Sequence, residues 1–140
     1  MVDFTKPVII IGGNPMKIRF NKTTFEMLDF PKHVQIVISL DRTGIGIRCC
    51  KSSDEKAAAV PKKSSNNNEY YELYASRFDQ LFSEVCSHWE KDKAYALNGR
   101  AKSNDSEHLV YFKLCNAEVF VENEVMTENE AEITIAQNRS

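Results

Sequence analysis

Apolar and polar residues alternate through much of the first half of the chain, and this pattern predicts short β-strands. The run Val8–Ile11 consists of β-branched residues and ends at Gly12-Gly13, where two adjacent glycines indicate a turn. Residues 16–20 then alternate apolar with basic side chains, as expected of a strand that buries one face. The beginning of the chain therefore predicts two strands joined by a tight turn.

A short helix and a hairpin are predicted next. Thr23–Glu26 matches a capping box, in which a Thr hydroxyl and a Glu carboxylate bind free amides at a helix start. Pro31 disfavours helical geometry in the residue before it, so we expect a helix of fewer than two turns. Residues 33–40 and 45–50 alternate as strands, and the loop Asp41–Gly44 between them predicts a hairpin in which Gly44 takes positive φ.

The second half repeats this order of elements. Residues 69–74 alternate as a strand, and from residue 75 the apolar positions change to a helical period. Residues 93–98 and 108–115 alternate again as strands, with a polar turn predicted over residues 99–107 between them. The apolar face of the predicted three-turn helix consists of Phe78, Leu81, Phe82, Val85 and Trp89.

The predicted fold class is α+β, with two β-α-β-β units, a mainly antiparallel sheet and a flexible acidic C-terminal tail. We expect a basic unit over residues 1–50, a polar linker over residues 51–68, an acidic unit over residues 69–121 and a mobile acidic tail over residues 122–140. One hypothesis is that the two units pack together as an intrachain pseudo-dimer. Because their residue identity is slight, the alternative is a coincidence of common α+β elements.

Charge divides the chain into two halves of opposite sign. Residues 1–68 contain 11 Lys/Arg and 6 Asp/Glu, a net charge of +5, whereas residues 69–140 contain 7 and 14, a net charge of −7. Five of those acidic residues are glutamates from Glu122 onward, where the only cation is Arg139. The pI near 5.9 is lower than expected of a dedicated DNA-binding domain, so we expect any nucleic-acid interface in the first half.

Several functional classes have no motif in the sequence. A nucleotide-binding glycine loop, a catalytic serine elbow and a zinc-protease motif are all absent, so we expect neither enzyme activity nor a cofactor. Cys86 and His88 are too few ligands for a zinc site, and the four cysteines are typical of free thiols in a reducing compartment. The apolar runs are too short for a signal peptide or a membrane span, so we expect a cytoplasmic protein without membrane contact.

Basic residues on or beside the first strands, helix and hairpin are candidates for phosphate contacts, because each neutralised phosphate releases counterions. The same alternation is also typical of the solvated face of an ordinary strand, and this alternative stays open. The candidate nucleic-acid-binding residues are Lys17, Arg19, Lys22, Arg42 and Arg48.

Part of the first half resembles the AbrB/SpoVT/MazE swapped-hairpin half-domain. The resemblance lies in residues 18–22 (IRFNK), 28–32 (LDFPK), 34–36 (VQI) and 41–48 (DRTGIGIR), within residues 16–50. Asn21 stands where the family commonly has proline, and His33 replaces its usual Gly-Asp. The resemblance implies a DNA-binding regulator whose half-domains exchange hairpins and present basic residues to DNA. The wider layout is similar to small proteins of bacteriophages and mobile elements in gut Firmicutes.

The acidic half suggests other functions. A phage-type inhibitor, such as an anti-CRISPR or other anti-defence protein, would use acidic surface to block a host nucleic-acid-binding protein. Its candidate partner-binding residues are Asp79, Glu84 and Glu90, although solubility alone also explains such side chains. A third hypothesis is a homo-oligomer, in which the basic half of one copy meets the acidic half of another.

Overall fold

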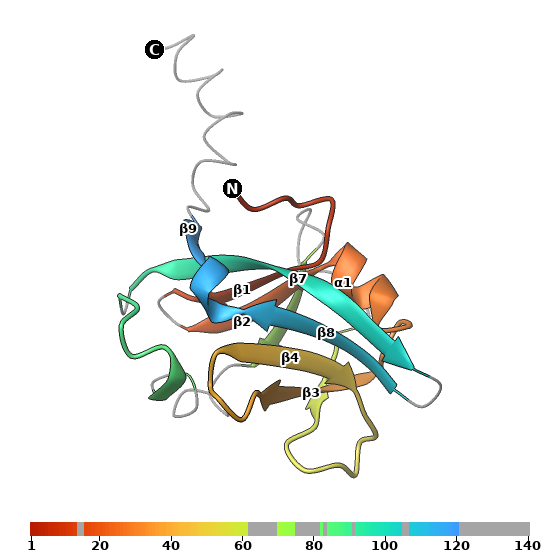
Figure 1. Ribbon diagram of the computed structural model, residues 1–140. Coiled ribbons are helices and arrows are strands. Elements are labelled where there is room, and N and C mark those ends of the chain that lie inside the picture. The colour runs from red at the N-terminus through yellow and green to blue at the C-terminus, as the bar shows by residue number, and fades with distance from the viewer. Residues whose placement is uncertain are drawn as a thin grey trace, which may run out of the picture.

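The structure is a computed structural model. The residues that it describes are 1–13, 16–61, 70–74, 82, 84–90, 92–104 and 107–120. These residues form a mostly antiparallel β-sheet with little helix, and the sheet curves until it nearly closes into a barrel (Figure 1). This architecture is compatible with a small protein of the α+β class.

Nine strands are present among the described residues. They are β1 (Val8–Gly12), β2 (Lys17–Asn21), β3 (His33–Ile38), β4 (Gly44–Cys49), β5 (Ala58–Ala59), β6 (Tyr70–Tyr74), β7 (Ala94–Asn104), β8 (Glu107–Lys113) and β9 (Glu118–Phe120). The helix α1 (Lys22–Met27) follows β2, and the 3₁₀ turn η2 (Leu114–Asn116) separates β8 from β9. Phe82, Glu84 and Val85 are also helical, whereas most of the helix predicted from residue 75 lies outside the described residues.

The strands follow the order β5-β3-β4-β8-β7-β1-β2-β6 across the sheet, with β9 paired to β7. The two ends of this path, β5 and β6, contact each other, and this contact brings the sheet close to closure. The long strand β7 joins two parts of the sheet, because Ala94–Asn98 pairs with β1 and Gly99–Asn104 pairs with β8. The predicted polar turn over residues 99–107 is therefore wrong for its first six residues, which continue the strand.

If the path is closed through the contact of β5 with β6, the strand order is unchanged when β1, β2, β3 and β4 are exchanged for β5, β6, β7 and β8 and the order is read in the opposite direction. In this exchange the pairs β2–β6 and β4–β8 map onto themselves, and β1 takes the position of β5. The interval 51–68, which the sequence suggests as a linker, contains this counterpart of β1 at Ala58–Ala59. The order of the strands thus has an internal twofold pattern, although β1 and β2 are paired whereas β5 and β6 only contact each other.

The main core lies inside the curved sheet and follows the alternation in the sequence. Ile18 and Phe20 of β2 point inward, as do Ile45 and Ile47 of β4, and all four are fully buried. Each such side chain stabilises the fold by roughly 1.5–3 kcal/mol relative to an exposed one. The alternation predicted for β2 and β4 is therefore confirmed, except that Cys49, which alternation places on the same face as Ile45 and Ile47, is exposed.

The apolar run of β1 is buried on both of its faces. Ile9 and Ile11 belong to the main core, whereas Val8 and Ile10 belong to a second cluster on the outward side of the sheet. This second cluster also contains Ala96 of β7. A continuous apolar run in place of an alternating one is what burial on both faces produces.

Asn21 begins α1 and also connects three segments of the chain. Its Oδ1 accepts hydrogen bonds from the backbone N of Thr24 at 3.1 Å, the hydroxyl of Thr24 at 2.7 Å and the backbone N of Val8 at 3.0 Å. Its Nδ2 donates to the backbone O of Lys6 at 2.8 Å and of Phe4 at 3.3 Å. The helix therefore has Asn21 as its N-cap in place of the predicted Thr23, because this side chain also satisfies a buried strand amide.

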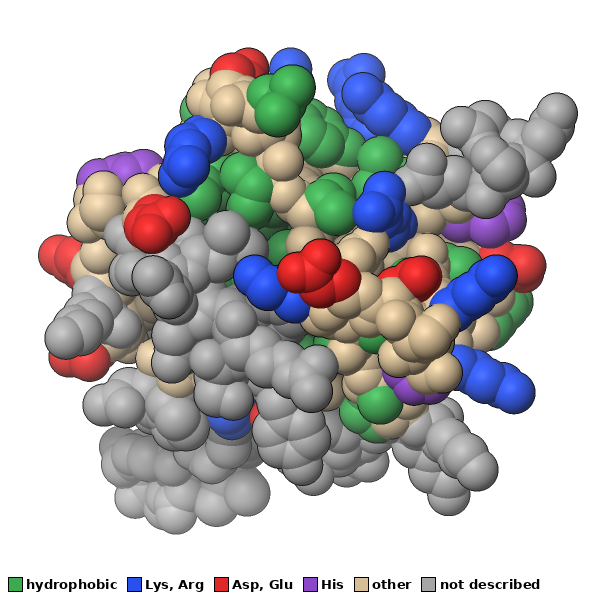
Figure 2. Space-filling view, turned by 90° about the horizontal axis from the view of Figure 1, so that it is seen from below, with side chains coloured by type: hydrophobic (Ala, Val, Ile, Leu, Met, Phe, Trp, Pro, Cys, Tyr) green, Lys and Arg blue, Asp and Glu red, His purple; other side chains and the backbone are tan. Residues whose placement is uncertain are grey.

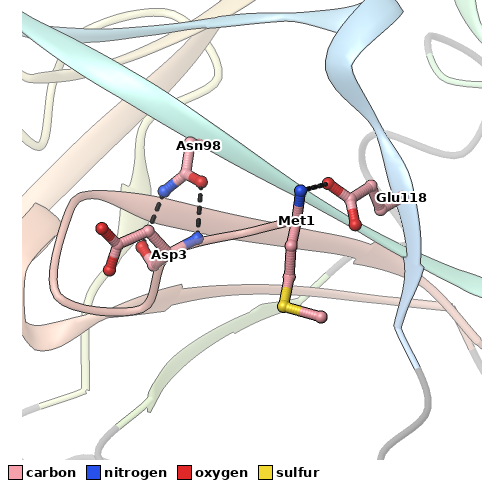
Figure 3. A network of polar contacts seen from close by, with 4 residues as sticks. All are labelled: Met1, Asp3, Asn98 and Glu118. Carbon is pink, nitrogen blue, oxygen red and sulfur yellow. Dashed lines mark hydrogen bonds and ion pairs between the residues drawn. The ribbon is translucent and has the colours of Figure 1, made fainter.

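The N-terminal segment lies across the outward side of β7 (Figure 3). The side chain of Asn98 accepts a hydrogen bond from the backbone N of Asp3 at 2.7 Å and donates one to its backbone O at 2.8 Å. The amino group of Met1 lies 3.0 Å from the Glu118 carboxylate on β9. These contacts hold residues of the N-terminus over the second apolar cluster.

Candidate nucleic-acid interface

Two of the five candidate phosphate-binding residues lie on β2 and have little exposed surface. Arg19 points outward from the sheet but is only 6% exposed, and its guanidinium lies 5.6 Å from the ring centroid of Phe120. Directly across from Arg19 on β6 is Glu72, a carboxylate at the paired position. Lys17 is half-buried. The burial of Arg19 leaves very little of its side chain for contact with a phosphate.

The other three candidates are more exposed but lie apart from one another. Lys22 is the first residue of α1 and is exposed, and Arg42 is exposed in the loop between β3 and β4. Arg48 lies on the outward side of β4, where its Nε donates to the Gln35 side chain at 2.8 Å. The five residues are thus spread over the outside of the sheet, a helix start and a loop.

The acidic candidates of the inhibitor hypothesis have cations of the same chain beside them. Glu84 lies 3.6 Å from Arg42, and Glu90 lies 2.6 Å from Lys93. Hydrogen bonding to Glu90 raises the pKa of Lys93 above its ordinary value. Asp79 lies outside the described residues. The two described glutamates are therefore each partly neutralised within this chain.

A different set of cations lies together on the outward side of β3, β4, β8 and the second half of β7, a surface that we call the open sheet face. Neighbouring strands in a sheet are about 4.8 Å apart, so cross-strand partners there are close neighbours. One row across the four strands consists of Gln35, Arg48, Leu109 and Lys102, the next of Val37, Gly46, Tyr111 and Arg100, and the third includes Gly44 and Lys113.

The open sheet face has an excess of positive charge. Arg100, Lys102 and Lys113 are exposed, and Arg48 is half-exposed beside them. None of the outward residues whose side chains the structure describes on these four strands is acidic. Seen from below, hydrophobic side chains gather in the upper part of the molecule, with Lys and Arg side chains and some Asp and Glu side chains around them (Figure 2).

Tyr111 lies near the middle of the open sheet face. Its phenol end occupies the space in which a side chain at Gly44 would stand, and Leu109 and Val37 occupy the corresponding space at Gly46. The ammonium group of Lys102 lies over the Tyr111 ring, 5.0 Å from its centroid. Gly44 does not have the predicted positive φ, since it is the first residue of β4 and its role is to make room for the ring.

The loop that borders this face is held by one carboxylate. Asp41 Oδ1 accepts hydrogen bonds from the Thr43 hydroxyl at 2.7 Å, the Ser39 hydroxyl at 2.8 Å and the Thr43 backbone N at 3.1 Å. The hydrogen bonds from Thr43 and Ser39 hold the pKa of Asp41 below its ordinary value of 3.8. The residue with positive φ in this loop is Arg42, at 61°.

Arg100, Lys102 and Lys113 were not among the candidates because they lie in the half of the chain with negative net charge. Residues 122–140 alone contain five glutamates, so much of that negative charge lies outside the described sheet. The alternation of Arg100 and Lys102 with small residues was the one sequence signal that these residues continue a strand.

The structure also bears on other kinds of site. Within the described part of the chain, no three His, Cys, Asp or Glu side chains lie close enough to hold a metal ion. No helix among the described residues is long and apolar enough to cross a lipid bilayer. Comparisons of the chain with protein-family models, curated proteins and solved structures gave no significant match.

Proposed function

We propose that this is a non-enzymatic nucleic-acid-binding protein that contacts phosphates through the open sheet face. The observation that carries the proposal is the group formed by Arg48, Arg100, Lys102 and Lys113 on one continuous surface. Cations grouped at this spacing release counterions when they neutralise phosphates, and this release drives sequence-independent binding. An aromatic ring among the cations is also typical of nucleic-acid interfaces.

The proposal includes the arrangement of the two units as an intrachain pseudo-dimer. Its support is the strand order, which is unchanged when the first four strands are exchanged for the next four. The pair β4–β8 maps onto itself in this exchange, so the open sheet face lies where the two units meet. In this arrangement Arg48 comes from the first unit and the other three cations come from the second, so both units contribute to one interface, as the AbrB-like resemblance implies for DNA-binding regulators.

The inhibitor hypothesis receives less support from the geometry. It requires acidic surface that is available to a basic partner, whereas Glu84 and Glu90 lie beside Arg42 and Lys93 of the same chain. Ion pairs of this kind reduce the net field that either glutamate presents to a second molecule. The cationic face is thus the better supported of the two interfaces.

Titration of the full chain with labelled single-stranded and duplex DNA at increasing salt tests the proposal. Four phosphate contacts predict a log–log slope of about −3 for affinity against salt. The double variant Arg100→Glu/Lys102→Glu should weaken binding by about tenfold or more and reduce the slope by about 1.5.

The matched control is Lys22→Glu/Lys32→Glu, which makes the same change in net charge at two exposed residues of α1 and the segment after it. This control should retain most of the binding. Equal weakening by both double variants would show that net charge decides binding, and would overturn the assignment to the open sheet face. Failure to bind any DNA at low salt would overturn the proposed function, and capture of a basic host protein that depends on Glu84 and Glu90 would favour the inhibitor hypothesis.

A further inference from the structure

The surroundings of Tyr111 suggest more than phosphate binding. A tyrosine in the middle of an exposed sheet usually stands beside neighbouring side chains of similar size. Here its cross-strand partner on β4 is Gly46, its partner on β7 is Arg100, and the space above Gly44 is filled by its own phenol end. The ring therefore extends over Gly44 of β4, whereas Leu109 and Val37 fill the space over Gly46.

In the structure, the exposed side chain of Lys102 occupies the position over the Tyr111 ring. The Lys102 ammonium lies 5.0 Å from the ring centroid, and its side chain is exposed on β7. An exposed cation–π contact favours this arrangement by only roughly two- to fivefold, whereas stacking of a base on an aromatic ring raises affinity by roughly 5- to 150-fold. A base can therefore displace Lys102, whose ammonium then becomes available to a neighbouring phosphate.

We infer that Tyr111 is the stacking site for an unpaired base, so that the open sheet face binds single-stranded nucleic acid in preference to duplex. This inference rests on the proposed function and specifies its ligand. In a duplex the flat faces of the bases are covered by their neighbours, and only base edges and phosphates are presented to a protein. A single strand presents both its phosphates and its base faces, which match the cations and the ring of this surface.

The decisive probes differ in whether they present a base. They are an oligothymidine of about 15 nucleotides, an abasic strand of the same length, and a mixed-sequence duplex. The wild-type chain should bind the thymidine strand at least fivefold more tightly than the abasic strand. Tyr111→Leu should weaken binding of the thymidine strand by roughly 5- to 150-fold and change binding of the duplex by less than about twofold, whereas Tyr111→Phe should retain both.

A second pair of variants displaces the ring without removing it. Gly44→Ala places a methyl group where the Tyr111 phenol end lies, and Gly46→Ala on the same strand meets Leu109 and Val37 instead. We expect Gly44→Ala to weaken binding of the thymidine strand and Gly46→Ala to leave it nearly unchanged. This comparison decides the question if Tyr111→Leu fails to fold, which its thermal unfolding curve will show.

The outcomes separate this inference from the proposed function. Wild-type binding by Tyr111→Leu, or equal affinity for the abasic and thymidine strands, overturns the stacking site. If the stacking site is overturned but Arg100→Glu/Lys102→Glu still weakens DNA binding, the proposed phosphate interface stands without a stacking site. The inference is supported if both Tyr111→Leu and Gly44→Ala weaken binding of the thymidine strand and leave binding of the duplex nearly unchanged.

Discussion

Two outward faces of one sheet each place a cation beside an aromatic ring, but only one of these pairs is exposed. Arg19 lies 5.6 Å from the Phe120 centroid and is 6% exposed, on the outward side of β1, β2 and the first half of β7, which we call the covered sheet face. Lys102 lies 5.0 Å from the Tyr111 centroid and is exposed on the open sheet face. The same kind of contact has a buried cation on one face and an exposed cation on the other.

The difference arises from what lies over each face. Phe4 of the N-terminal segment packs against Phe120, with ring centroids 6.1 Å apart, and both rings lie on the side of Arg19. Val2 packs against the apolar cluster beneath them. The open sheet face has glycines at positions 44 and 46, and the Tyr111 side chain of the same face lies over Gly44. Among the described residues, the two faces thus differ in whether the N-terminal segment packs beside their cation–ring pair.

The largest effect is expected from removing Asn21, which holds the N-terminal segment that lies over the covered sheet face. Asn21→Ala should destabilise the protein by about 2–4 kcal/mol, because the change removes a helix cap and leaves buried groups of Val8 and Thr24 with fewer partners. Urea unfolding measures this change. The variant should also bring Arg19 into solvent more often, which faster hydrogen exchange in the N-terminal segment would show.

Asn98→Ala is the matched control for this prediction. It removes the same side chain from the covered sheet face, but Asn98 is half-exposed and holds only the N-terminal segment, through Asp3 and Pro7. We expect a loss of about 0.5–1.5 kcal/mol. Equal losses in the two variants would contradict the central role of Asn21.

A direct comparison of the two cations is expected to give the next largest effect. Arg19→Ala should cost about 1–3 kcal/mol of stability, since the arginine is buried and packs on Phe120. Lys102→Ala should change stability by less than about 0.5 kcal/mol, because its side chain is exposed. Thermal or urea unfolding of both variants under one condition measures the difference, and equal stability losses would contradict the division into a covered and an open face.

The sequence predicted the inward faces of the strands well, because alternation depends only on neighbouring residues. Ile18, Phe20, Ile45 and Ile47 all point into the core as expected. The outward faces could not be predicted in the same way. Alternation alone does not distinguish Arg19 from a solvated arginine, since its burial depends on Phe120, about one hundred residues later in the chain.

The candidate site shows the same limit. Local turn geometry predicts a positive φ at Gly44, whereas in the fold Gly44 makes room for Tyr111 of β8, a strand that pairs with β4 from the other half of the chain. Arg100 and Lys102 were included in a half of negative net charge, although β7 and β8 place them beside β4. Charge summed along the sequence does not give the charge of a face when the strands of both halves are interleaved.

The smallest effects are expected from two carboxylates, Asp3 near the covered sheet face and Asp41 beside the open sheet face. Asp3 of the N-terminal segment accepts a hydrogen bond from the Thr5 hydroxyl through its Oδ1, and Asp41 beside the open sheet face accepts one from the Thr43 hydroxyl in the same way. These hydrogen bonds hold the pKa of each carboxyl below its ordinary value of 3.8. A lowered pKa in the folded state means that the stabilisation is present above 3.8 and is lost as the pH falls through the folded value.

Asp3→Asn and Asp41→Asn should therefore each lower the urea midpoint slightly at neutral pH, and the gap from wild type should close in acid. Both carboxylates are exposed, so solvent screening keeps the two effects small. Hydrogen exchange of backbone amides distinguishes the two variants. Asp3→Asn should speed exchange at Thr5 in the N-terminal segment, and Asp41→Asn should speed exchange at Thr43 beside the open sheet face. A gap that stays constant as the pH falls would mean that the amide differs from the carboxylate in shape or packing alone, and that the charge of neither turn stabilises its face.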